Sequence, residues 1–368
     1  MKRIDGRFTD AAAQGGILLV DKPAGKTSFT IVDQVRRVLA ESLAADPVPT
    51  PPTGSESLAA PQATARRRRR VKCGHAGSLD PIATGLLILM YGRGTRLSPF
   101  LMGLDKSYTA RVRFGVSTDT LDVAGQPTEV RPVTCSPREL ERLLPRFLGD
   151  QEQVPPAYSA IKWQGQPLYK RARRGETLPP LQPRPIHIKR LAIRDSDWGE
   201  TAASEGLAAP DGLVYELTLE IECSSGTYVR ALARDLAVAL GTVGYVQRLR
   251  RDRVGPFQLA DALPSDGLAD PARMGEILIP LGRSLPHLPR LRLSDQEARC
   301  VRQGQQPEVN WLNRLEPAAN PGRDDPSHFL MLDLAGDLVA VGALGVDGGG
   351  PSSAAVFPAS QGKARPCA

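Results

Sequence analysis

The stretch that most constrains this chain is Lys72–Met90, with the sequence KCGHAGSLDPIATGLLILM. A Gly-rich turn carrying Asp80 leads into the apolar run Leu86–Met90, which predicts a buried strand. Because Pro81 follows it, Asp80 is restricted to extended backbone. Asp80 is therefore either a carboxylate held for chemistry at the mouth of a strand or an ordinary turn aspartate before a proline.

Charge and composition limit the classes of partner and compartment. A net charge of +7 favours a polyanionic partner, with nucleic acid ahead of a membrane surface. Five scattered cysteines without a CxxC pair, and only four histidines, argue against a structural zinc site and favour a reducing compartment. The N-terminus lacks the apolar core of a signal peptide, and no run reaches the roughly 18 apolar residues of a membrane span. We expect a soluble, cytoplasmic protein.

Hydrophobic periodicity predicts both strands and helices in the first 260 residues. The strand Lys106–Phe114 places Tyr108 on its apolar face and Arg111 and Arg113 on the other, so we expect a half-buried strand with a basic outer face. Helices are expected over Ile31–Ala40, capped by Thr27 or Ser28, and over Ser136–Leu144, where Ser136 and Glu139 have the spacing of a capping box. Further strands are expected at Gly16–Val20, Pro185–Arg194, Leu213–Cys223 and Val243–Val254.

The stretch Ser224–Gly241 predicts a turn followed by an amphipathic helix, with Tyr228 and Arg230 in the first turn. The positive end of the helix dipole makes an arginine locally unfavourable there. Arg230 therefore either has an acidic partner from elsewhere in the chain or keeps its guanidinium in water.

Composition also suggests a domain organisation. We expect a flexible leader at 1–14, a first domain at 15–275, a small β-rich domain at 285–358 and a disordered tail at 359–368. Within the first domain, the Ala/Pro/Ser-rich segment 41–70 predicts a disordered insertion, and 197–212 a variable loop. Residues 264–289 have the composition of a linker. In the last domain we expect a helix from Ser294 to Arg302 and a hairpin formed by His328–Leu334 and Leu338–Leu344.

Two further motifs and two basic segments bear on what the chain binds. The run Gly25-Lys26-Thr27 does not complete a phosphate loop, because Val20 stands where that motif needs glycine. The acidic loop Ser117–Gly125 does not have the spacing of a calcium loop. The five arginines Arg66–Arg70 and the basic strand would contact phosphates without selecting a base.

Four motifs in chain order resemble the TruB type of tRNA pseudouridine synthase. They are LLVDKPAGKTS at Leu18–Ser28, GHAGSLDPIATGLL at Gly74–Leu87, KSY at Lys106–Tyr108 and CSSGTYVRALARDL at Cys223–Leu236. The similarity runs over roughly residues 16 to 258. It implies an α/β (α+β) pseudouridine synthase fold, with a mixed, mainly antiparallel sheet flanked by helices around a central cleft. The C-terminal segment resembles a PUA domain, a small RNA-binding β-barrel.

The resemblance implies that a uridine in the T loop of tRNA, at position 55 by tRNA convention, is isomerised to pseudouridine. The N1 glycosidic bond would break and re-form at C5, without a cofactor or a metal. Asp80 would be the essential carboxylate, Arg230 its partner, and Tyr108 the residue that stacks on the base and handles the C5 proton. Substrate-binding or supporting positions would be Lys22, His75, Tyr228 and Leu249, with His75 packing into the T loop from which bases have flipped.

Several points stay open at the level of sequence. Asp80 could attack C1′ of the ribose, attack C6 of the uracil, or assist a glycal route. The expected partner is tRNA, held at its T arm and elbow and, through the PUA-like domain, at its acceptor end, by a monomeric enzyme. The alternative function is a tRNA-binding or folding chaperone that acts independently of catalysis.

Overall fold

The computed structural model describes residues 15–44, 71–201, 210–211, 213–319, 327–345 and 350–359. The expected leader, the arginine run Arg66–Arg70, most of the expected loop at 197–212 and residues 360–368 lie outside the described residues.

Two expected boundaries differ from the structure. Residues 41–44 form the last turn of helix α2 (Ser28–Ala44), where glutamate, leucine and alanine favour helix over the disorder expected from 41. Residues 197–201 continue strand β10 (Arg184–Thr201), because the indole of Trp198 packs between Phe114 and Tyr215 and donates to the carbonyl oxygen of Cys135 at 3.0 Å.

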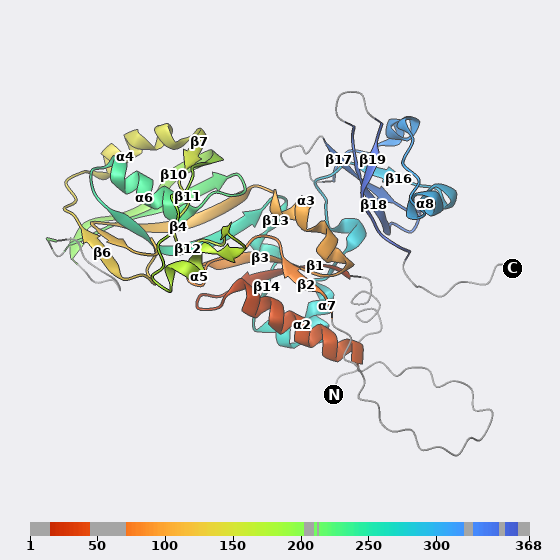
Figure 1. Cartoon of the computed structure of the whole chain (residues 1–368), viewed down its shortest axis with the longest axis horizontal. Helices are drawn as coiled ribbons and strands as arrows, with labels where there is room; N and C mark the ends of the chain where they lie inside the picture. The colour runs from red at the N-terminus through yellow and green to blue at the C-terminus, as the bar shows by residue number, and fades with distance from the viewer. Residues whose placement is uncertain are drawn as a thin grey trace, which may run out of the picture.

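In the described part of the chain, eleven strands form one mixed, mainly antiparallel sheet (Figure 1). Eight lie in the spatial order β14 (Leu263–Pro264), β1 (Gly15–Lys22), β3 (Thr84–Gly92), β12 (Gly244–Val254), β4 (Lys106–Phe114), β11 (Leu213–Cys223), β10 (Arg184–Thr201) and β7 (Gly149–Gln153). Three short strands pair beside this path: β2 (Cys73–His75), β13 (Phe257–Gln258) and β15 (Ile279–Pro280). The pairs β12–β3 and β1–β14 are parallel. This confirms the predicted sheet class.

Strands β1 and β3 each carry a continuous apolar run because both faces of the sheet are covered there. Alternate residues of β1 enter opposite cores: Leu18 and Val20 face the core shared with α2, whereas Ile17 and Leu19 face a second core. A strand covered on both faces buries every side chain, which explains the continuous runs GILLV and LLILM.

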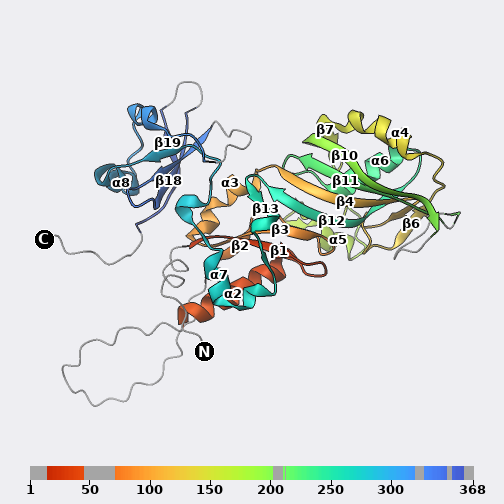
Figure 2. The ribbon, with the colours of Figure 1, turned by 180° about the vertical axis from the view of Figure 1, so that it is seen from behind.

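Helices flank the sheet (Figures 1 and 2): α2, α4 (Pro137–Leu143) and α6 (Val229–Ala239) pack in the core that contains Leu18, and α3 (Ser98–Met102) packs in the core that contains Ile17. The predicted apolar stripe of α6 is buried at Val229, Leu232 and Leu236. The capping box at Ser136 and Glu139 is confirmed at the start of α4. The other described helices are α5 (Leu168–Ala172), α7 (Pro271–Glu276) and α8 (Asp295–Arg302). Two small hairpins pair β5 (Val116–Thr118) with β6 (Pro127–Val130), and β8 (Lys162–Trp163) with β9 (Gln166–Pro167).

The segment expected to be a linker contributes two short strands to the edge of the main sheet, with helix α7 between them. Strand β14 pairs with β1 in parallel and β15 pairs with it antiparallel, on the side away from β3. Without these short strands, β1 would present an unpaired edge, which folded proteins avoid. The need to cover that edge is a tertiary requirement that composition does not reveal.

The C-terminal residues form a second sheet that packs against the first domain near α3 (Figures 1 and 2). Its strand order is β16 (Arg290–Arg292), β17 (His328–Leu332), β18 (Leu338–Ala343) and β19 (Ser352–Val356). The predicted helix is α8, and its cap at Ser294 is confirmed, as is the hairpin β17–β18. Among the described strands no pairing joins β16 to β19. The PUA-like barrel therefore stays a prediction.

The prediction of a basic outer face for β4 is wrong in one respect. Arg113 is 1% exposed and donates to the Glu216 carboxylate at 2.6 Å, and Arg111 is paired with Glu216 and Asp197. Glu216 lies directly opposite Arg113 on β11, so the charges are neutralised within the sheet. Arg113 cannot contact a phosphate, because it is buried.

Candidate active site

A cavity of about 310 Å³ lies where the Asp80 loop, β4, β12 and the start of α6 meet. Five of the seven candidate residues line it, although they come from distant parts of the sequence: Asp80, Tyr108, Tyr228, Arg230 and Leu249. Asp80 sits in the turn between β2 and β3, and Tyr228 and Arg230 begin α6. The fold therefore brings the separate motifs to one place.

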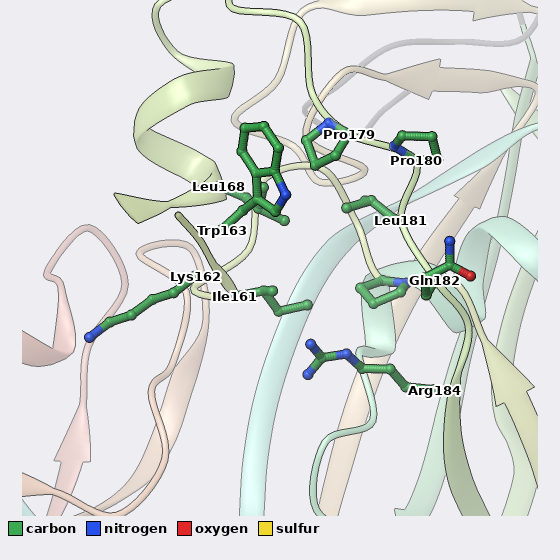
Figure 3. Close-up of a pocket in the computed structure, with 10 residues that line it drawn as sticks. Ile161, Lys162, Trp163, Leu168, Pro179, Pro180, Leu181, Gln182 and Arg184 are labelled. Atoms are coloured by element: carbon green, nitrogen blue, oxygen red, sulfur yellow. The ribbon is translucent and has the colours of Figure 1, made fainter. Parts of the chain in front are cut away.

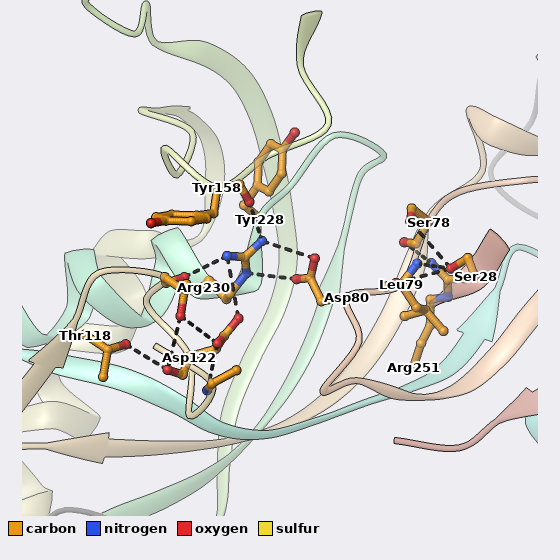
Figure 4. Close-up of polar contacts among 12 residues, drawn as sticks. Ser28, Ser78, Leu79, Asp80, Thr118, Asp122, Tyr158, Tyr228, Arg230 and Arg251 are labelled. Atoms are coloured by element: carbon orange, nitrogen blue, oxygen red, sulfur yellow. Dashed lines mark hydrogen bonds and ion pairs between the residues drawn. The ribbon is translucent and has the colours of Figure 1, made fainter. Parts of the chain in front are cut away.

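Asp80 and Arg230 form a two-pronged ion pair in this cavity (Figure 4). Nε of Arg230 lies 2.8 Å from one carboxylate oxygen of Asp80, and Nη2 donates to the other at 3.1 Å. The side chain of Arg230 is 4% exposed, whereas that of Asp80 is 37% exposed. The guanidinium is thus a buried clamp that leaves the carboxylate open to the cavity. The acidic partner that Arg230 required is Asp80.

Two backbone carbonyl oxygens also accept hydrogen bonds from Arg230 (Figure 4). Nη1 donates to the carbonyl oxygen of Thr120 at 2.7 Å, and Nη2 to that of Tyr158 at 2.9 Å. Asp122 lies 3.6 Å from Nη1, and burial raises the pKa of its carboxyl group, while Thr120 and Arg230 act in the opposite direction. Sequence reasoning identified the acidic loop but missed Asp122, because no local pattern indicates that this residue lies beside Arg230.

Two tyrosines complete the polar wall of the cavity. Burial raises the pKa of Tyr108, with the neighbouring Arg251 acting in the opposite direction, and burial likewise raises the pKa of Tyr228. The backbone of Tyr228 is fixed by the buried Gln153, whose amide accepts from Tyr228 N at 2.8 Å and donates to Tyr228 O at 3.1 Å. Gln153 was not among the candidates from sequence.

Lys22 lies behind the Asp80 loop, outside the lining of the cavity. It is fully buried, and its Nζ donates to the carbonyl oxygens of Pro23, Lys26 and Pro81. Burial lowers its pKa to about 8, against the attraction of Asp80. These contacts support the loop from behind, and the substrate contact expected for Lys22 stays a prediction.

His75 is also outside the cavity lining, on β2 opposite Leu89. Burial and then the charge of Arg251 lower its pKa, so the imidazole is neutral at neutral pH. Its Nδ1 is buried without a hydrogen-bond partner in the described part of the chain. The T-loop contact expected for His75 stays a prediction.

A second cavity of about 260 Å³ lies beside the first, around Trp163 and the segment 179–184 (Figure 3). Its wall is mostly apolar, with Ile161, Leu168 and Leu181 among its residues, and the guanidinium of Arg171 lies 4.4 Å from the centre of the Trp163 ring. No carboxylate, histidine or cysteine is among its lining residues. Acid–base chemistry therefore belongs to the first cavity.

The described residues contain neither a metal-binding cluster nor a membrane-spanning helix. Within them, no group of three or more His, Cys, Asp or Glu side chains is placed to hold a metal ion. None of the described helices is long and apolar enough to cross a membrane.

Comparisons with known proteins agree on one family. The model of the TruB family pseudouridylate synthase N-terminal domain matches residues 65–229. The chain is 41% identical over 295 residues to "tRNA pseudouridine synthase B" of Caulobacter sp. (strain K31), covering 79% of this chain and 81% of the relative. It is 34% identical over 339 residues to the protein of the same name from Stutzerimonas stutzeri (strain A1501), covering 90% and 92%.

A solved structure supports the fold independently. The chain superposes on a protein in the "Crystal Structure of a Cbf5-Nop10-Gar1 Complex" with a TM-score of 0.60 at 20% identity, covering 95% of this chain and 87% of that one. At this identity the similarity establishes the fold alone.

Proposed function

The chain belongs to the TruB family of pseudouridylate synthases, and we propose that it isomerises uridine to pseudouridine in tRNA, at position 55 of the T loop. The curated relatives carry the name tRNA pseudouridine synthase B. The observation that carries the proposal for this chain is the Asp80–Arg230 pair, in which a buried guanidinium holds a partly exposed carboxylate at the mouth of a cavity.

The reaction rearranges bonds without net loss of atoms. The bond from C1′ to N1 of uracil breaks, the bond from C1′ to C5 forms, C5 gives up its proton and N1 gains one. Asp80 is the one carboxylate among the residues lining the cavity, so we assign it the essential chemical role. That role is attack at C1′ of the ribose, attack at C6 of the uracil, or assistance to a glycal route. Arg230 orients this carboxylate through two hydrogen bonds and limits its rotation.

Tyr108 and Leu249 are assigned to holding the uracil ring. Because burial raises the pKa of Tyr108, its phenol is protonated at neutral pH. A protonated phenol favours stacking on the base and hydrogen bonding over direct removal of the C5 proton. Leu249, which is 7% exposed, and the half-buried Tyr228 supply the facing walls.

Release of tritium from tRNA labelled at C5 of uridine tests the proposal. The wild-type protein should release label, and Asp80→Asn should release none above background while still binding tRNA. Mapping of the product should place pseudouridine at position 55. Equal release by Asp80→Asn and wild type would overturn the role of Asp80, and an inactive wild type would overturn the proposed function.

We further propose that the protein acts as a cytoplasmic monomer without a metal, and that its C-terminal sheet contacts the acceptor end of tRNA. Full activity in EDTA, a monomer mass in solution, and protection of the acceptor end in a footprint are the expected results.

A further inference from the structure

The backbone of the Asp80 loop is held from behind by hydrogen-bond donors from several segments. All five carbonyl oxygens from Gly77 to Pro81 accept hydrogen bonds. Within the loop, Asp80 O accepts from Ala83 N at 3.1 Å. The other four carbonyl oxygens accept from groups outside the loop. The guanidinium of Arg251 donates to Gly77 O and Ser78 O. The hydroxyl of Ser28 donates to Leu79 O, and both Lys22 Nζ and Gly25 N donate to Pro81 O.

Ser28 makes the contact next to the reactive carboxylate (Figure 4). Its Oγ accepts from Leu79 N at 2.8 Å and donates to Leu79 O at 3.1 Å, across 51 residues of sequence. One hydroxyl can do both because it carries one donor hydrogen and two lone pairs. Ser28 is 2% exposed and Leu79 is 4% exposed, so water cannot replace either bond at no cost.

The hydroxyl of Ser28 is not needed to start helix α2. The neighbouring Thr27 caps the N-terminus of this helix, since its Oγ1 accepts from Thr30 N at 3.0 Å. Ser28, the first residue of α2, is thereby free to turn its hydroxyl to the loop. The helix, packed in the main core through Ile31 and Val35, gives it a rigid base.

We propose that Ser28 is a positioning residue for the isomerisation: its hydroxyl fixes the Leu79 backbone so that the carboxylate of Asp80 stays aligned with Arg230 and with the substrate. This rests on the proposed function. Lys22 and Arg251 hold the two sides of the loop, but each also supports other segments, since Lys22 bonds Pro23 and Lys26 and Arg251 bonds Leu86. Ser28 acts on the residue immediately before Asp80.

The test compares Ser28→Ala with Thr27→Ala, which removes a hydroxyl from the adjacent residue without touching the loop. Under single-turnover conditions, with the enzyme in saturating excess over tRNA, Ser28→Ala should lower the rate roughly 10- to 100-fold, because small misplacements of a catalytic group cost about this much. The KM for tRNA should stay within about twofold. Thr27→Ala should lower the melting temperature through loss of the cap and leave the rate unchanged.

A second measurement separates positioning from general loss of structure. Exchange of the Leu79 amide hydrogen should accelerate in Ser28→Ala, while amides in the core of β3 should exchange as in wild type. If Ser28→Ala does not fold, Ser28→Cys keeps nearly the same volume with a weaker hydrogen-bonding group and should show the same fall in rate.

Three outcomes would overturn the inference: a Ser28→Ala rate within twofold of wild type despite faster exchange at Leu79, a rise in KM alone, or a loss of rate that matches the loss of folded protein. An inactive wild type would refute the proposed function itself, and Leu79 exchange, which reports the Ser28 contact without activity, distinguishes that failure from a failure of this inference.

Discussion

At the scale of single residues, Arg230 explains why the site needs an arginine. Its planar group directs two donors at Asp80 and the others at the carbonyls of Thr120 and Tyr158, with Asp122 nearby. Lysine has three donors on one atom and cannot reproduce this fork. The buried position also makes any unpaired partner costly.

Arg230→Lys should therefore lower the single-turnover rate at least about a hundredfold, the equivalent of losing one to two charged hydrogen bonds. Binding of tRNA should change little, because the head group of Arg230 is buried behind Asp80. The measurements are the single-turnover rate and the dissociation constant for tRNA. A variant that binds tRNA poorly but reacts at the wild-type rate once saturated would contradict this assignment.

Lys22 gives a prediction about pH. Burial lowers its pKa in the folded protein to about 8 from 10.5. Between these values the unfolded chain holds a proton that the folded protein has lost, so this lysine makes stability rise with pH across the window. The difference between the pKa values corresponds to about 3 kcal/mol at most.

The measurement is urea unfolding of wild type and Lys22→Met at about pH 7.5, 9 and 10.5, which span this window. Comparison with the variant isolates the contribution of Lys22 from that of other groups. The stability of wild type minus that of the variant should increase with pH. Lys26→Met, at an exposed lysine in the same turn, is the matched control. A wild-type advantage that shrinks as the pH rises would show that the sign is wrong.

At the scale of elements, the critical contact is the close approach of β3 to β12. Gly85 has φ +101°, and a Cβ there would lie 2.3 Å from the backbone oxygen of Arg251. These two residues face each other in the parallel pair β12–β3. The absence of a side chain at Gly85 lets Arg251 reach back beneath the Asp80 loop.

Gly85→Ala should thus destabilise the protein by at least about 3 kcal/mol, since it combines a strained φ with a backbone clash. Gly74→Ala is the matched comparison, because the nearest atom to a Cβ there is Met90 Cε at 3.9 Å. It should change stability by less than about 1 kcal/mol. Similar melting temperatures for the two variants would refute this account of the β3–β12 contact.

At the scale of the whole molecule, the two sheets share a core. Phe357, Leu330 and Val341 of the C-terminal sheet pack with Ile17 of β1 and Leu86 of β3 in one buried cluster. Arg93 and Arg96 add hydrogen bonds to backbone carbonyls of Pro358 and Val356. The second sheet therefore covers the face of β3 that carries Leu86, opposite the face that carries Leu87.

Phe357→Ala should lower the stability of both sheets together, by about 3–5 kcal/mol for a fully buried phenylalanine. Variants keeping only Trp198, in the main sheet, or only Trp311, in the C-terminal part, report each sheet by fluorescence. Both transitions should shift, whereas Val309→Ala, at a residue that is 65% exposed, should shift neither. A shift seen only by Trp311 would mean that the sheets unfold separately.

Sequence alone determined the local parts of this protein. Period-two and helical patterns located β4, β11 and α6, and the capping boxes at Ser136 and Ser294 were visible because they depend on residues three apart. The motif resemblance also identified Asp80 and Arg230 as partners, 150 residues apart.

Only the tertiary structure decided which groups support that pair. Asp122, Gln153 and Ser28 act through contacts between segments far apart in the chain, and no local spacing encodes such contacts. Burial likewise gives Arg113 a structural role in place of the expected phosphate contact and places Lys22 behind the Asp80 loop. The physical reason is that hydrogen-bond geometry and exclusion of water are properties of the packed molecule, and a charged residue has the same sequence signature whether it faces solvent or the core.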